Sequence, residues 1–218
     1  MRTLPVLSAG LLALLGSVAL AEELPVVKET EALRRGCSYK FKVLDDSAQG
    51  SQFEYPSGPP WRTTNGKYKL VVQTESVSYM CRARSQTVEI SKAFEVPDIA
   101  IQIGDAGLVV AYTRGAYHPW VGYTRIIDLK RLDPISLAPT KATDLYARYG
   151  QGSADFAPGA LSLTGLNIYN RSLEVTGGVT GTTIWGGGST QSGTGDSFVA
   201  GYLEFFGDSP QAPGIVIY

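Results

Sequence analysis

Apolar and polar residues alternate with a period of two along most of this chain. In residues 37–44 (CSYKFKVL), aromatic and aliphatic side chains alternate with lysines, which is the pattern of a strand with one buried face. The same alternation appears in residues 67–73 (KYKLVVQ) and 75–85 (ESVSYMCRARS). It predicts that Cys81 lies on the apolar face of its strand.

Further strand-like runs follow at short intervals and are separated by Gly, Pro, Asn or Asp. They are residues 87–90, 99–103, 107–113, 121–129, 144–149, 161–170, 172–176, 197–206 and 214–218. Runs of this length, rich in β-branched and aromatic residues, are typical of a sandwich or barrel. Asn65-Gly66 adds a strong hairpin signal. We predict an all-β protein, an antiparallel sandwich or barrel-like domain with about ten short strands.

Two segments depart from this pattern. Residues 28–35 are charged, precede Gly36 and could form a short N-terminal helix. Residues 176–197 consist mostly of Gly, Ser and Thr but contain Trp185. A flexible linker has no use for Trp185, so we expect residues 182–185 to form a short strand or anchor and residues 186–196 to form a Gly-rich loop. The indole of Trp185 is expected either to pack on the core or to serve as a ligand platform.

The chain divides into three expected parts. Residues 1–21 combine Arg2, an apolar run and a final small-x-small motif, as in a signal peptide. Residues 22–36 form a charged segment, and residues 37–218 are expected to form a single β domain. Pro134 and Pro139 interrupt the pattern, so residues 133–141 are either a sub-boundary or a crossover within one domain.

The two cysteines, Cys37 and Cys81, both follow the expected signal peptide. In an exported chain, an isolated pair is most simply a disulfide. We therefore expect an oxidising location, which is the periplasm, the cell envelope or the extracellular space. Apart from the short run in the signal peptide, no segment is long and apolar enough for a transmembrane helix.

Charge argues against nucleic acid as a partner. The whole chain has 19 basic and 20 acidic residues, whereas nucleic-acid binding requires a clearly basic surface. The charge is unevenly distributed, because residues 149–218 contain Arg171 as their one basic residue and five acidic residues.

The sequence contains no catalytic or metal-binding signature. It has a single histidine, His118, no G-x-S-x-G nucleophile motif and no phosphate-binding Gly-rich motif. One histidine and two paired cysteines cannot form a typical zinc or copper centre. We expect no metal, no cofactor and no enzymatic activity. A carboxylate-based hydrolase stays open as an alternative, with Glu95 and Glu204 as its first candidate acids.

Aromatic residues are the remaining enrichment, and they are concentrated in residues 112–123 (YTRGAYHPWVGY). Aromatic rings with polar tips suit sugar faces or partner proteins. The candidate binding residues are Tyr112, Arg114, Tyr117, Trp120, Tyr123 and Trp185.

The pattern as a whole favours an exported cell-envelope or surface protein with a non-catalytic role in binding or structural attachment. Its partner is expected to be an envelope or surface protein or a glycan. A small outer-membrane β-barrel is a second interpretation, supported by the chain length and the Tyr and Gly content. Against it, Pro210 and Pro213 lie where a closing strand should run.

Overall fold

The computed structural model describes residues 23–47, 66–118, 122–150, 157–207 and 211–218, with the side chains of residues 116–118, 122 and 123 excepted. Sixteen strands and no helix occur in these ranges, which confirms the all-β prediction with more strands than the ten or so expected. No helix in the described ranges is long and apolar enough to cross a membrane. The expected signal peptide lies outside the described residues.

Four antiparallel strands form the first sheet, sheet A, in the order β1-β2-β3-β4. They are β1 (Val26–Arg34), β2 (Cys37–Asp45), β3 (Tyr68–Ser76) and β4 (Gln86–Ala93). In β2 and β3, alternate side chains point into the protein, as the period-two pattern predicts.

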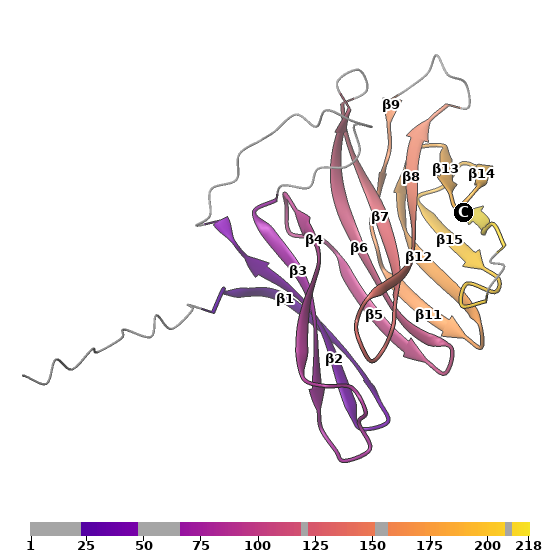
Figure 1. The fold of residues 1–218 in the computed structure, drawn as a ribbon. Helices are drawn as coiled ribbons and strands as arrows, with labels where there is room; N and C mark the ends of the chain where they lie inside the picture. The colour runs from indigo at the N-terminus through magenta and orange to yellow at the C-terminus, as the bar shows by residue number, and fades with distance from the viewer. Residues whose placement is uncertain (1–22, 48–65, 119–121, 151–156, 208–210) are drawn as a thin grey trace, which may run out of the picture.

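The other twelve strands form a sheet that folds back on itself, so that its end strands β14 and β16 come into contact and the sheet is nearly closed (Figure 1). We call the first part the central wall and the second part the outer wall. The central wall contains β5 (Ile99–Gly104), β6 (Gly107–His118), β7 (Gly122–Leu132), β8 (Pro139–Tyr149), β13 (Thr183–Gly186) and β14 (Ser189–Ser192), with β9 (Ala157–Pro158) beside β8. The outer wall contains β11 (Gly165–Tyr169), β12 (Ser172–Thr180), β15 (Ser197–Tyr202) and β16 (Gly214–Ile217). Strand β10 (Ala160–Leu161) pairs with both β7 and β12 and links the two walls.

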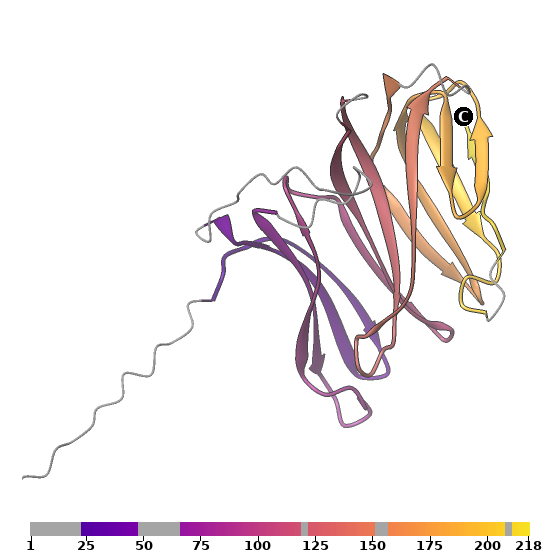
Figure 2. The ribbon, with the colours of Figure 1, turned by 45° about the horizontal axis from the view of Figure 1, so that its top comes forward.

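Two hydrophobic clusters hold the three layers together, and strand β6 contributes to both. Leu108, Val110 and Tyr112 pack toward sheet A, whereas Val109 and Ala111 pack toward the outer wall, and all five are fully buried. Figure 2 shows the layers edge on, with β6 and β7 between sheet A and the outer wall. A strand buried on both faces needs a continuous apolar run, which residues 108–112 provide.

The prediction of a short helix at residues 28–35 is wrong. These residues lie in β1, which pairs with β2 through a turn at Arg35 and Gly36. Both turn residues have positive φ, 46° and 73°, as a two-residue hairpin requires. An isolated helix of eight residues is marginal in water, whereas β1 gains backbone hydrogen bonds and buries part of Ala32 against the core.

Two other predictions need local correction. The expected strand at residues 75–85 ends at Ser76, and β4 starts only at Gln86, so Cys81 lies in a loop and not on a strand. The expected Gly-rich loop at residues 186–196 contains strand β14, which forms a hairpin with β13. Gly187 and Gly188 form the turn of this hairpin with positive φ values of 54° and 91°, and glycine adopts such values at little steric cost.

The segment at residues 133–141 connects β7 to β8 within the fold. Leu137 is fully buried in the cluster between sheet A and the central wall. The Asp133 carboxylate accepts hydrogen bonds from the backbone N–H groups of Ile135 and Ser136, at 3.0 and 2.7 Å. The backbone hydrogen bond from Ser136 is the main cause that lowers the pKa of Asp133.

A disulfide joins Cys37 to Cys81, which confirms the predicted pairing. The two cysteines are 44 residues apart in sequence, and in the chain-entropy model a closed loop of this length stabilises the folded state by about 4 kcal/mol. We therefore expect the Cys37→Ser/Cys81→Ser double variant to lose roughly this amount in urea unfolding. Titration of two free thiols in the native, unreduced protein would contradict the disulfide.

Candidate functional site

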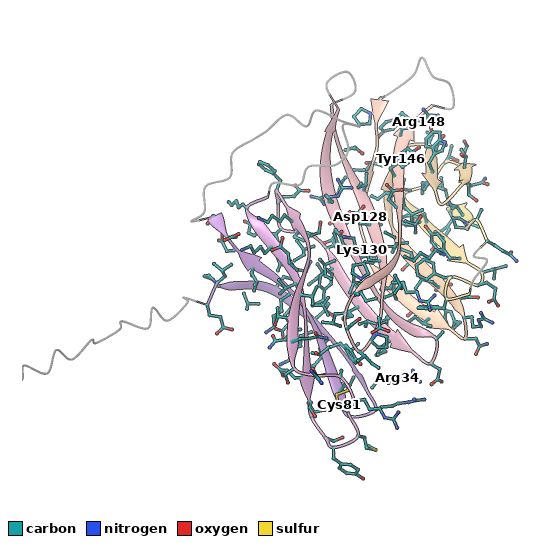
Figure 3. All side chains as sticks on the ribbon, viewed as in Figure 1. Arg34, Cys81, Asp128, Lys130, Tyr146 and Arg148 are labelled. Carbon is teal, nitrogen blue, oxygen red and sulfur yellow. A yellow bond between two sulfur atoms is a disulfide. The ribbon has the colours of Figure 1, made fainter. Side chains whose placement is uncertain are left out.

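The candidate site lies where the cover provided by sheet A ends. Sheet A lies against β5 and β7, and the same face of the central wall continues over β8 and β13 with exposed or half-buried side chains. We call this region, which sheet A does not cover, the open face and define it by Asp128, Asp144, Tyr146, Arg148 and Trp185. Figure 3 shows its labelled members along β7 and β8.

Strand alternation places these side chains. Leu145 and Ala147 of β8 are buried against the outer wall, so Asp144, Tyr146 and Arg148 point to the opposite face. In β13, Ile184 is fully buried and its neighbour Trp185 takes the open face.

Tyr146 and Trp185 are register partners on neighbouring strands. Their rings stack with centroids 5.5 Å apart and an angle of 10° between planes. The guanidinium carbon of Arg148 lies 3.5 Å from the centroid of the indole ring. The side chain of Tyr146 is 41% exposed, so the Tyr146 ring is the more solvent-exposed part of this stack, and the cation lies over the indole.

A nearly buried ion pair marks the border of the open face. Arg114 of β6 donates from Nε to Oδ2 of Asp128 at 2.8 Å and from Nη2 to Oδ1 at 3.2 Å, and the two side chains are 8% and 15% exposed. Burial acts to lower the pKa of Arg114, but the hydrogen bonds and charge of Asp128 outweigh it and raise that pKa above its usual value. This fork of two hydrogen bonds from one guanidinium to both carboxylate oxygens is the geometry in which Arg binds a carboxylate most strongly.

Lys130 and Tyr112 lie next to this ion pair, under the edge of sheet A. Lys130 Nζ donates to the backbone oxygen of Ile90 on β4 at 2.7 Å and lies 5.8 Å from the centroid of the Tyr112 ring. Burial is the main cause that lowers the pKa of Lys130. Tyr112 is fully buried and packs edge-on against Phe41. Burial is also the main cause that shifts the pKa of the Tyr112 phenol, which it raises because it disfavours the charged form.

Asp128 and Asp144 are register partners on β7 and β8, so their carboxylates emerge side by side on the open face. Arg114 neutralises the first of them. Asp144 lies nearer the aromatic pair. Burial is the main cause that raises the pKa of Tyr146. The charge of Arg148 acts to lower this pKa, and the charge of Asp144 acts to raise it.

Three of the six candidate residues from the sequence, Tyr112, Arg114 and Trp185, lie on this one face of the central wall. Tyr112 contributes to the core, Arg114 to the ion pair, and Trp185 to the aromatic surface. Tyr117 and Tyr123 are register partners in the β6–β7 hairpin, and Trp120 lies outside the described residues.

Sequence reasoning missed Asp128, Asp144, Tyr146 and Arg148. The signal for three of them was present, because residues 144–149 (DLYARY) alternate between polar or aromatic and aliphatic residues. What the sequence could not show is which strand lies beside β8, and therefore that Tyr146 meets Trp185.

The two acids expected for a hydrolase lie apart from the open face, and each binds an arginine. Glu95 pairs with Arg125 at 2.9 Å and Glu204 pairs with Arg171 at 3.0 Å. A groove of about 690 Å³ lies near Arg171, lined by Arg34, Ile103, Gly104, Asp105, Ala106, Ile168, Asn170, Arg171 and Phe206. Its arginines bind Asp105 and Glu204. We take the open face as the candidate site because it joins a stacked aromatic pair to charged side chains.

Comparison with protein-family models, with curated proteins and with solved structures finds no match to this chain. Within the described ranges, no group of three or more His, Cys, Asp or Glu side chains is arranged to hold a metal ion. The functional argument therefore rests on the geometry of the open face.

The Arg114–Asp128 pair predicts a measurable coupling. Replacing one partner removes the main counter-charge of the other, nearly buried side chain, so Arg114→Met and Asp128→Leu should each lower the free energy of unfolding by about 3 kcal/mol. The double variant should lose much less than the sum, as measured by urea denaturation. Arg125→Met is the matched control, because its pair with Glu95 is more exposed and should cost about 1 kcal/mol or less. Additive losses in the double variant would contradict the coupling.

Proposed function

We propose that this chain is an exported, non-catalytic binding protein that holds a glycan chain on its open face. The observation that carries the proposal is the stacked Tyr146–Trp185 pair, which lies on a solvent-facing sheet surface directly beside Asp144 and Arg148. Flat apolar area next to convergent polar groups is the usual composition of a small-ligand site.

The chemistry of these groups favours sugars. A pyranose ring has an apolar face of C–H groups, which packs on an aromatic ring, and a rim of hydroxyls that both donate and accept hydrogen bonds. The half-exposed ring of Tyr146 offers the first contact. A carboxylate such as Asp144 accepts hydrogen bonds from hydroxyls, and a guanidinium such as Arg148 donates to them.

The geometry of the carboxylates supports binding rather than hydrolysis. A glycoside hydrolase needs two carboxyl groups that flank the scissile bond, one as acid and one as nucleophile or base. At the open face, both oxygens of Asp128 accept hydrogen bonds from Arg114, so this carboxylate is held by a structural ion pair. Glu95 and Glu204 each accept an arginine at other places on the molecule.

Export to the cell envelope or cell surface is part of the same proposal. The Cys37–Cys81 disulfide is a bond typical of oxidising compartments outside the cytosol. The signal-like residues 1–21 point the same way.

A panel of soluble polysaccharides tests the proposal by affinity electrophoresis. For a polysaccharide that retards the protein, Trp185→Ala and Tyr146→Ala should each weaken binding by about tenfold, equivalent to about 1.4 kcal/mol. Asp144→Asn should also weaken binding relative to the parent protein, because the amide has one acceptor oxygen in place of two. Tyr169→Ala is the matched control, since this exposed tyrosine lies on β11 in the outer wall.

Two outcomes count against the proposal. Retardation by no member of the panel, or equal retardation of the Trp185→Ala and control variants, would remove the open face as a glycan site. If the parent protein released reducing sugar ends from the polysaccharide and the Asp144→Asn variant did not, the function would be hydrolysis and not binding alone. Thermal unfolding of each variant separates lost binding from lost folding.

A further inference from the structure

A second exposed surface lies at the far end of sheet A, in the loop between β3 and β4. We call residues 77–84 the tip. Three of its side chains are apolar and largely exposed: Val77 at 59%, Tyr79 at 96% and Met80 at 57%. Apolar side chains that lie together and outside a fold commonly mark an interaction site.

The tip is held in place by several independent bonds. Cys81 is tied to Cys37 by the disulfide, and the backbone N–H groups of Val77 and Ser78 both donate to the Gly36 oxygen, at 2.9 and 3.1 Å. Thr74 Oγ1 donates to the backbone oxygen of Arg84 at 2.6 Å. The apolar side chains are therefore presented outward by a fixed backbone, which reduces the entropy lost when they bind.

The turn of the β1–β2 hairpin is shaped to fit against the tip. Gly36 has a φ of 73°, and a Cβ atom at this position would lie 1.9 Å from Oγ of Ser78. Glycine is thus required both by the turn and by the close approach of the tip. The contact anchors the tip to the start of β2.

The charge of the tip has one sign. Residues 76–85 contain Arg82 and Arg84 and no acidic residue. Both arginines are exposed, and neither forms an ion pair with another described residue. Exposed apolar side chains flanked by cations are the composition of segments that lie at an anionic membrane surface.

We propose that the tip docks on an anionic lipid surface. Val77, Tyr79 and Met80 enter the boundary between headgroups and acyl chains, and Arg82 and Arg84 contact lipid phosphates. A tyrosine suits this boundary because its ring is apolar and its hydroxyl stays hydrated. The contact is reversible, since few apolar side chains enter the lipid and each arginine adds only a modest attraction.

Lipid fits the tip better than an acidic protein does. A stable protein interface buries roughly 800 Å² on each partner, so a protein partner would have to contact residues beyond the three exposed apolar side chains of the tip. Partition into lipid needs no complementary pocket and improves with each apolar group inserted. The tip also lies at the opposite end of the molecule from Tyr146 and Arg148, next to the labelled Cys81 in Figure 3. Docking would leave the open face accessible.

Co-sedimentation with vesicles tests the inference on the folded, disulfide-bonded protein. Phosphatidylcholine vesicles containing phosphatidylglycerol should bind the protein, and vesicles of phosphatidylcholine alone should bind it much less. Tyr79→Ser/Met80→Ser should weaken binding by about tenfold. Arg82→Gln/Arg84→Gln should weaken it comparably and flatten its dependence on salt. The matched control is Tyr169→Ser/Leu203→Ser, because both residues are 58% exposed and lie outside the tip.

A fluorescence readout reports insertion separately from stability. In a Tyr79→Trp variant, the added tryptophan contributes fluorescence, which is obtained by subtracting the spectrum of the parent protein. This difference spectrum should shift to shorter wavelength when anionic vesicles are added. The inference is overturned by absence of binding to the anionic vesicles, by equal binding to both vesicle types, or by equal binding of the tip and control variants. Binding to a soluble acidic protein that depends on Tyr79, without binding to vesicles, would assign the tip to a protein partner. Because the glycan test uses other residues, either proposal can fail without the other.

Discussion

The burial of strand β6 on both faces is the constraint on which the rest of the fold depends. Leu108, Val110 and Tyr112 need cover from one side, and Val109 and Ala111 need it from the other. A two-layer sandwich covers only one face of each strand, so this strand requires three layers. Sheet A provides one cover, and the chain after β8 folds back as the outer wall to provide the second. At about 25 cal/mol per Å² of apolar surface removed from water, leaving either side uncovered would be costly.

The open face follows from an unequal number of strands in the layers. Sheet A has four strands and ends over β7, while the central wall continues through β8 and β13. At this edge the side chains change from apolar to charged, with Tyr112 under the cover and Arg114 and Asp128 at its border. The fork between Arg114 and Asp128 compensates for the loss of water that partial cover imposes on both charges. Beyond the border, Tyr146 and Trp185 remain in contact with solvent.

The sequence predicts the fold class because period-two alternation is local, and the apolar run at residues 107–113 already marks a buried strand. It predicts the disulfide from two cysteines and an export signal. It fails where the outcome depends on distant neighbours. Residues 28–35 have no strong local preference and become a strand because β2 offers a hydrogen-bonding edge. The pairing of β8 with β13 joins Tyr146 to a residue 39 positions later, and no local pattern contains that register. Only Arg114 and Trp185 of the open face and its border were therefore anticipated.

The glycines of the last third of the chain are explained by close packing rather than by flexibility. A Cβ on Gly177 would lie 1.9 Å from the backbone oxygen of Ser162, and a Cβ on Gly186 would lie 2.4 Å from a methyl group of Leu145. Both glycines are buried within strands, where a side chain would force neighbouring strands apart. The approach of β13 to β8 that Gly186 permits is also the approach that brings Trp185 onto Tyr146. The composition that resembles a linker is therefore a condition for the aromatic pair of the open face.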